Sequence, residues 1–311
     1  VISEYLYHAP KGQKAMIFNR ARQTFTFTEE KVKRSVIGEM VAPNQLFFSV
    51  ACTTNDAQCI AAMQWFRNQV FFSRDYSDIP QQLIEYSEDK NMLNAISDYA
   101  KAADVGIQDM RFVFNSKEIH KGESLPTDLP EEVKAALVKF MQTLSETSNN
   151  NEVYLKMGKV SAKASHQGVN DDGQKVSYSL ELSEESDGTR KLMALAPAIE
   201  SALRTGGVLL VDELGRELHP ALVDYIVAKF QSKETNPNGA QIIFTTHNTE
   251  LMNLELIRKD QIYLVDKRDR DGVSELYAMS DFATRTTETI RKGYLVGKYG
   301  AVPDVEIAEV E

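Results

Sequence analysis

The feature that most constrains the fold is a run of branched apolar residues, Val208–Val211, that ends directly in Asp212 and Glu213. Because the run has no polar alternation, it predicts a strand buried on both faces in the centre of a parallel sheet. Open α/β sheets bind ligands at the carboxyl ends of their strands, where both acids fall. One carboxylate there can hold Mg²⁺, and the other can polarise an attacking water. The alternative is a buried strand followed by an acidic turn or a helix cap.

Two neighbouring segments favour the functional interpretation. Downstream, Gln241–Thr246 is a second apolar strand, and it leads into His247. Upstream, Glu185–Lys191 holds a Ser-x-Gly turn that opens a helical pattern, and such a turn exposes N–H groups and a positive dipole end to a phosphate. This order of pieces within about 60 residues is a specific signal. A lone histidine at a strand end has a simpler role too, since it often only satisfies a nearby backbone group.

These residues resemble the motifs of the ABC-type ATPases, the head-domain class shared by transporters, SMC-like DNA machines and bacterial defence ATPases. Asp212 falls on the Walker B aspartate, Glu213 on the catalytic glutamate and His247 on the switch histidine. The strings Glu-Ser-Asp-Gly-Thr-Arg, Leu-His-Pro and Lys298–Pro303 look closest to the AAA-family ATPases of abortive-infection and anti-phage systems. The resemblance is strong after Leu180 and loose before it.

The signature loop of this class, usually Leu-Ser-Gly-Gly-Gln, falls on residues 185–189. Ser186 and Gly188 match the usual residues, whereas Asp187 and Thr189 depart from them. At the D-loop, where transporters carry Leu-Asp, this chain has Leu-His. The resemblance therefore does not carry over the usual D-loop aspartate contact.

The resemblance implies an α/β, ABC-type P-loop NTPase-like core with a mostly parallel sheet, N-terminal antiparallel strands and a helical insertion. It implies an ATPase that uses ATP and Mg²⁺, with catalytic roles for Glu213 and His247. Nucleotide contacts would come from Ser186–Thr189 and Asp212, with Asp212 as the Mg²⁺ ligand. Two copies would form an ATP-dependent head-to-tail dimer, with ATP between the phosphate loop of one and the signature turn of the other.

A phosphate loop of the form G-x-x-x-x-G-K-[ST], whose N–H groups and lysine hold the phosphates, is not found in the sequence. The nearest string, Gly293–Tyr299, is one residue short and has tyrosine in place of the Mg²⁺-binding hydroxyl. We therefore expect the chain to be the larger C-terminal portion of a longer protein, with the phosphate loop in a preceding segment. On that expectation the chain alone is inactive.

Composition narrows the classes of partner. The formal net charge of −10 argues against whole-molecule attraction to DNA, although 35 Lys and Arg residues leave room for a local basic patch and a nucleic-acid ligand. Cys52 and Cys59 have no zinc spacing, so we expect free thiols in a reducing cytoplasm. The sequence has no run of about 18 apolar residues, so we expect no membrane span.

Changes of pattern along the chain predict three parts, which are N-terminal core strands at 1–28, a helical insertion lobe at 29–151, and a C-terminal ATPase lobe at 152–311. Within them we expect a long helical stretch over Gln81–Ala103 and a short strand at Arg111–Phe114. Pro197 lies inside the helix that follows the signature turn and is expected to kink or break it near Ala196.

Three functions fit these observations. The first, from the resemblance, is a defence ATPase that senses infection and releases or drives a toxic effector, commonly a nuclease. The second is a DNA-repair or chromosome-associated ATPase, which a basic groove and DNA-stimulated turnover would distinguish. The third is a non-hydrolysing scaffold, which an absence of nucleotide binding would favour.

Overall fold

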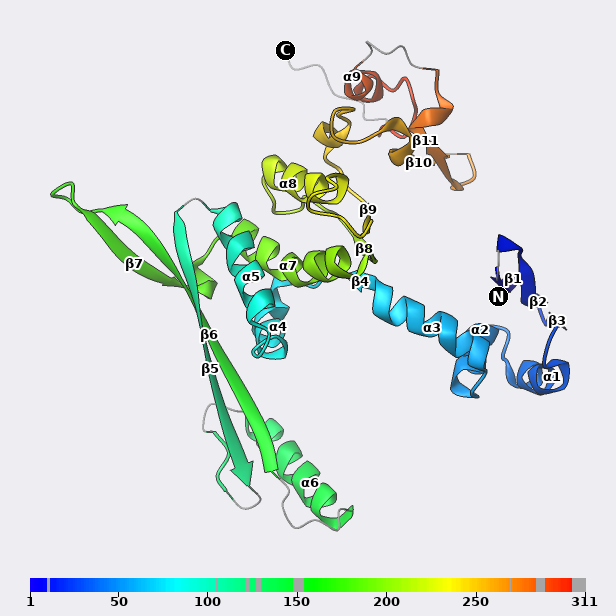
Figure 1. Cartoon of the computed structure of the whole chain (residues 1–311), viewed down its shortest axis with the longest axis horizontal. Coiled ribbons are helices and arrows are strands. Elements are labelled where there is room, and N and C mark those ends of the chain that lie inside the picture. Colours follow the sequence, from blue (N-terminus) through cyan, green and yellow to red (C-terminus); the bar gives the residue numbers. More distant parts are fainter. Residues whose placement is uncertain are drawn as a thin grey trace. The chain divides into compact units, whose positions relative to one another are not determined.

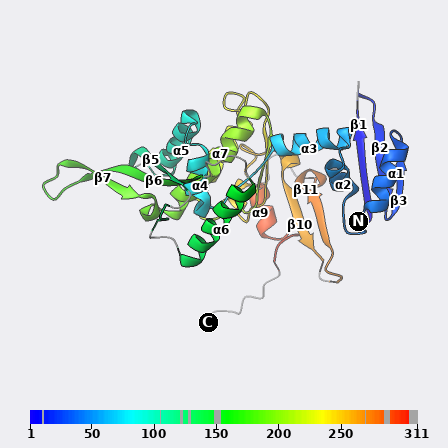
Figure 2. The ribbon, with the colours of Figure 1, turned by 90° about the horizontal axis from the view of Figure 1, so that it is seen from below.

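The protein divides into two compact units, Val1–Phe71 and Phe72–Glu311 (Figures 1 and 2). A computed structural model describes residues 1–9, 12–104, 106–120, 123–126, 130–147, 154–268, 270–283 and 289–303. The predicted mixed α/β fold with a parallel sheet is confirmed. The predicted lobe boundary after residue 28 stays a prediction, and the boundary at Asn151 lies outside the described residues.

Unit 1 is a small antiparallel sheet covered by helices. Its aromatic residues recur at every second position, and the resulting strands pair in the order β1 (Ser3–His8), β2 (Ala15–Ala21), β3 (Thr24–Phe27). The chain continues through α1 (Lys31–Met40), α2 (Phe47–Thr53) and α3 (Ala57–Gln69). The fully buried ring of Phe47 lies 4.7 Å from that of Phe18 and 5.2 Å from that of Phe27. The first turn of α2 is thereby anchored in the core of the sheet.

A buried ion pair ties α1 to the start of α3. Arg34 Nε lies 2.8 Å from Asp56 Oδ2, and the two side chains are 1% and 0% exposed. Asp56 also caps α3 by accepting a 3.1 Å hydrogen bond from the Cys59 amide. Burial favours a higher pKa for Asp56, but hydrogen bonds from Arg34 and Cys59 outweigh it and hold the pKa below its usual value. The carboxylate is therefore ionised in the folded unit.

Unit 2 is built around a three-stranded sheet in the order β4–β8–β9. Its strands are β4 (Val70–Phe72) at the boundary of the units, β8 (Val208–Val211) and β9 (Gln241–Phe244). β8 and β9 are parallel, with Val211 opposite Phe244, as the two apolar runs predict. The expected burial on both faces is wrong, since only every second residue of β8 is fully buried and Ile243 of β9 is 59% exposed. Between them the chain forms α8 (Pro220–Gln231), a crossover of the βαβ type.

Helix α7 (Asp187–Thr205) is the main buried helix of unit 2. Pro197 lies within one continuous helix, so the expected break near Ala196 does not occur, and the alternative, a kink, stays a prediction. Proline in a helix interior costs about 3 kcal/mol, and the burial of the surrounding α7 side chains offsets this cost. The buried residues near Pro197 in α7 are Leu192, Met193, Leu195, Ala196, Ile199 and Leu203. α7 ends at Gly206, whose φ of 71° is left-handed, and a Cβ there would lie 2.6 Å from the Asn238 carbonyl oxygen.

The helical prediction upstream is partly wrong. The stretch expected as one helix is two, α4 (Ile79–Glu85) and α5 (Lys90–Ala103), because Asp89 stops the pattern and caps α5 through a 3.1 Å hydrogen bond from the Met92 amide. α5 packs against α7, and Tyr99 Oη donates a 2.8 Å hydrogen bond to Glu200.

A long antiparallel ribbon replaces the predicted short strand at Arg111–Phe114. β5 (Ile107–His120) pairs along its length with β6 (Tyr154–Val169), and β7 (Lys175–Glu181) extends the sheet beside the end of β6 (Figure 1). α6 (Glu131–Thr147) lies in the connection between β5 and β6. Only part of each strand is apolar. Pairing between the strands over many residues therefore stabilises the ribbon more than a deep core does.

The end of unit 2 explains the glycine-rich string Gly293–Tyr299. The hairpin of β10 (Tyr263–Lys267) and β11 (Ser274–Ala278) is followed by α9 (Ile290–Leu295). Tyr299 is buried, Tyr277 Oη donates a 2.7 Å hydrogen bond to its carbonyl, and a Cβ at Gly293 would lie 2.8 Å from its ring. The string is thus a packed structural turn. Across the described residues, no helix is long and apolar enough to cross a membrane.

Short 3₁₀ turns complete the described part of the chain; they are η2 (Tyr76–Asp78), η3 (Leu182–Glu184), η4 (Thr249–Leu251), η5 (Lys259–Gln261) and η6 (Met279–Asp281).

Asp56→Ala is expected to reduce the free energy of unfolding by about 3–5 kcal/mol, because it leaves the Arg34 guanidinium buried without its partner. The pKa of Asp56 is lower in the folded state than in the unfolded state, so the ionised carboxylate stabilises the fold above the unfolded-state pKa of about 4. This stabilisation is lost as the pH falls from about 4 through the folded-state pKa. Urea unfolding at pH 7 and pH 3 measures both effects. Lys33→Ala, which removes an exposed ion pair to Glu30 and an exposed 2.9 Å hydrogen bond to the Asn55 carbonyl, is the control and should cost less than about 2 kcal/mol. Equal losses in the two variants would contradict the prediction.

Candidate functional site

Asp212 and Glu213 lie at the carboxyl end of β8, where Thr245 of the neighbouring strand end holds them in place. The Thr245 hydroxyl donates a hydrogen bond to Asp212 Oδ1 and accepts one of 2.8 Å from the Glu213 amide. The backbone continues the pairing, because the Leu214 amide donates to the Thr245 carbonyl at 2.8 Å. One hydroxyl therefore positions both acids. Sequence reasoning assigned no role to Thr245, although a Thr-Thr pair at a strand end beside two acids was the available signal.

The Glu213 carboxylate lies between two cationic or titratable side chains. Its Oε2 lies 3.3 Å from Arg216 Nη1, and its Oε1 lies 3.8 Å from His247 Nε2. The backbone of Glu213 has a φ of 53°, a left-handed conformation that side chains with a Cβ rarely adopt. The His247 side chain is 93% exposed, so it faces solvent and has few protein neighbours. The structure thus brings Asp212, Glu213 and His247 together at one strand edge.

The Ser-x-Gly turn caps α7. Ser186 Oγ accepts a 3.1 Å hydrogen bond from the Thr189 amide and lies 2.8 Å from the Thr189 hydroxyl. Asp187 is exposed and pairs with Arg190 one turn along. The amides of Asp187 and Gly188 are the first of the helix and have no intrahelical acceptor, so they can bind an anion.

The start of α7 touches the loop that follows β8. A Cβ added at Gly188 would lie 3.0 Å from the Glu217 carbonyl oxygen, closer than nearly all real contacts. This close approach is a physical reason for glycine at that position. Among the described residues, no hydrogen bond or ion pair joins the Ser186 turn directly to Asp212 or Glu213. The two groups of predicted site residues are therefore neighbours through Gly188 and Glu217, and not one constellation within a single copy.

Further charged residues surround the start of α7. The Arg190 guanidinium lies 4.7 Å from the centre of the Tyr76 ring, a cation–π distance. Asp75 caps the turn at Tyr76, and hydrogen bonds from Ser77 lower the pKa of Asp75, with Lys191 adding a smaller effect. The residues Tyr76 and Arg190 were not predicted, because nothing in the sequence places them opposite each other.

The site offers a metal ion the single carboxylate of Asp212 and not a complete set of protein ligands. Within the described ranges, no group of three or more His, Cys, Asp or Glu side chains could hold a metal. Mg²⁺ commonly binds through one or two carboxylates, water and substrate phosphates. Asp212 is exposed and has one oxygen engaged by Thr245, so it fits an ion shared with a nucleotide.

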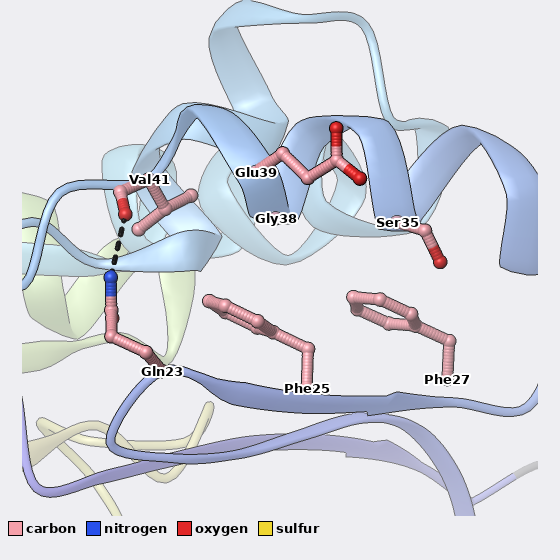
Figure 3. A pocket seen from close by; sticks show the side chains of 7 residues that line it. All are labelled: Gln23, Phe25, Phe27, Ser35, Gly38, Glu39 and Val41. Carbon is pink, nitrogen blue, oxygen red and sulfur yellow. Dashed lines mark hydrogen bonds between the residues drawn. The ribbon is translucent and has the colours of Figure 1, made fainter.

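Unit 1 has a separate pocket of about 330 Å³ between α1 and β3 (Figure 3). The rings of Phe25 and Phe27 lie 6.1 Å apart and 13° from parallel, and Gln23 Nε2 closes one end by donating a 3.1 Å hydrogen bond to the Val41 carbonyl. Glu39 is the one acidic side chain among the residues that line it. Apolar rings with a single carboxylate suit packing better than catalysis, so we place the candidate site in unit 2.

A left-handed backbone such as that of Glu213 destabilises a residue with a Cβ by about 1 kcal/mol. The free energy of unfolding of Glu213→Gly should therefore be about 1 kcal/mol larger than that of Glu213→Ala. Both variants lack the carboxylate, so the comparison isolates the backbone. Urea denaturation followed by circular dichroism measures it. The same two substitutions at Glu255, which is outside the left-handed region, serve as control and should reverse the order. Equal stabilities at position 213 would show that its conformation carries no strain.

Comparisons with known proteins show the family of the chain. A family model described as "AAA domain, putative AbiEii toxin, Type IV TA system" matches residues 52–253, roughly two thirds of the 311 residues. The chain is also similar to the "Retron Vc95 probable ATPase" of Vibrio cholerae serotype O1 biovar El Tor, with 34% identity over 84 residues. That match covers 27% of this chain and only 15% of the relative. On the strength of the family match, the chain belongs to the AAA-domain family of AbiEii type.

Proposed function

We propose that this chain is the part of an ABC-type ATPase that carries the hydrolytic carboxylate and the signature helix. The observation that supports this most is the arrangement of Asp212, Thr245 and Glu213 at the end of two parallel strands. A hydroxyl that fixes one acid by its side chain and the next by its amide makes the two carboxylates differ in role. Asp212 is held as a metal ligand, and Glu213 is left free to contact water.

Mg²⁺ bound at Asp212 supplies positive charge to the phosphate oxygens. The Glu213 carboxylate accepts a hydrogen bond from a water and orients it for in-line attack on the γ-phosphate. Arg216, whose Nη1 lies 3.3 Å from Glu213 Oε2, restrains this carboxylate. His247 is close to Glu213 yet almost fully exposed, so its ring is free to contact the γ-phosphate.

The signature turn acts on the nucleotide of a second copy. Ser186 and the free amides of Asp187 and Gly188 present donors to a phosphate, and the dipole of α7 adds to their effect. Within one copy these groups are separated from Asp212 by the Glu217 segment, which fits a site completed by a partner. Dimerisation is then head to tail and depends on ATP, so the ATPase works as a switch.

The comparisons support the biological setting that we propose. The family description names a toxin–antitoxin system, and the relative is named as a probable ATPase of a retron. We infer that the intact protein acts in the cytoplasm in anti-phage defence and controls a partner effector or nuclease. DNA-stimulated turnover would instead favour a DNA-associated ATPase, and absence of nucleotide binding would favour a scaffold.

Glu213→Gln, made in the natural reading frame, is expected to lower steady-state ATP hydrolysis by about 10²–10⁴-fold, since the amide no longer activates water. The variant should still bind Mg-ATP and should remain dimeric while ATP is present. Phosphate release and light scattering measure the two effects. Glu255→Gln, an exposed acid outside the site, is the control and should be active. Unchanged turnover in Glu213→Gln would refute the assignment of this residue.

A second test separates the head-to-tail dimer from a site made within one copy. Ser186→Arg and Glu213→Gln should each be inactive alone. In a head-to-tail pair, the mixed dimer has one site with both defects and one that is intact, so an equimolar mixture should recover about a quarter of the normal activity. No recovery in a mixture that exchanges subunits would show that Ser186 does not act in trans.

A further inference from the structure

A buried His–Glu pair lies directly behind the signature turn. His166 Nε2 and Glu185 Oε1 are 2.8 Å apart, and the side chains are 5% and 2% exposed. Tyr178, opposite His166 on β7, stacks on the imidazole ring with centroids 5.3 Å apart and an angle of 13° between the ring planes. The imidazole is therefore held between a strand neighbour and a carboxylate from another segment.

The carboxylate in this pair immediately precedes the cap of α7. β7 ends at Glu181, the chain turns back through η3, and Glu185 reaches His166 in the interior of the sheet. The next residue, Ser186, is the N-cap whose Oγ receives the Thr189 amide. The direction in which the chain enters α7 is thus set by where Glu185 is anchored.

The opposite edge of the imidazole is also closed. A Cβ at Gly106 would lie 3.2 Å from His166 Nδ1 and 3.0 Å from Asp104 Oδ1. The Gly106 amide in turn donates a 2.7 Å hydrogen bond to Asp104 Oδ1, which fixes the turn between α5 and β5. Gly106 therefore lies beside one edge of the ring, and Glu185 is bonded at another.

Energetics indicate a positioning role for the pair. Burying a carboxylate is costly, and an apolar pair of similar volume is often as stable as a buried ionic one. The polar pair adds a defined position, because the 2.8 Å hydrogen bond fixes the Glu185 carboxylate to His166 Nε2 on β6. We propose that His166 is a positioning residue that fixes the signature turn, residues 185–189, to the β5–β6–β7 sheet. The catalytic part of this inference rests on the proposed function.

The test uses variants that differ in one property. His166→Phe keeps an aromatic ring for Tyr178 but loses the bond to Glu185, whereas His166→Gln can still donate to that carboxylate. Lys163→Ala is the control, because it removes an exposed ion pair to Glu181 between the same two strands. Amide hydrogen exchange of peptides covering 184–190, in the protein made in its natural reading frame, reports on the turn whether or not ATP is hydrolysed.

In His166→Phe, exchange in this segment is expected to rise by about tenfold, as the loss of a buried hydrogen bond predicts. His166→Gln and Lys163→Ala should stay within about threefold of the unchanged protein. If His166→Phe does not fold, Gly106→Ala takes its place, since its Cβ presses on the ring and should raise exchange by an intermediate amount. Unchanged exchange in His166→Phe, or in Gly106→Ala where that variant is used, would overturn the inference.

Turnover gives the second measurement. A loosened signature turn should lower kcat by about tenfold with little change in KM, and His166→Gln should restore it. Raised exchange with an unchanged kcat would overturn the positioning role in catalysis. If the unchanged protein hydrolyses no ATP, the proposed function fails while the exchange result still decides whether His166 holds the turn.

Discussion

The candidate site depends on one hydroxyl group. Thr245 follows β9, and its side chain joins the end of that strand to the end of β8 by bonding both Asp212 and the Glu213 amide. Parallel strands by themselves bring their carboxyl ends only to the same edge. The hydroxyl turns this proximity into a defined geometry, in which the chain after β8 bends sharply and Glu213 adopts its left-handed backbone. The Leu214 amide donates a 2.8 Å hydrogen bond to the Thr245 carbonyl, and the Thr246 hydroxyl donates one of 2.8 Å to the Leu214 carbonyl. The turn after Glu213 is therefore bonded to the end of β9 as well.

A second constraint links this edge to α7. The helix is buried along most of its length, so its start cannot shift without disturbing the core of unit 2. Gly188 allows the Glu217 carbonyl to approach the first turn, and Glu185 anchors the preceding residue to His166. The Ser186 turn is therefore held from the loop after β8 and from the sheet. A phosphate-binding turn held from two sides is preorganised, and preorganised donors are the kind that stabilise charge effectively.

The parts of the structure that the sequence predicted share one physical property, which is that their signal is local. The apolar β8 and β9 strands and the helix that opens at the Ser-x-Gly turn are each specified within a few neighbouring residues. The length of the β5–β6 ribbon was missed because it comes from pairing between segments far apart in sequence. At Pro197 the expected break does not occur, since burial around the proline outweighs a strong local rule. Thr245 and His166 were not assigned because a hydroxyl and an imidazole gain their roles only from neighbours in space.

The buried His166–Glu185 pair also bears on how the ribbon and the site relate. β6 carries His166 near one end and runs without interruption to Tyr154, the residue opposite His120. Every residue of β6 in this range has a partner on β5, and the one register shift of the pairing lies beside His166, between Ile107 and Asp109. The sole residue between the anchored Glu185 and the first helical residue of α7 is the cap Ser186. The ribbon is thus joined, through the hydrogen bond between His166 and Glu185, to the turn that we propose binds phosphate.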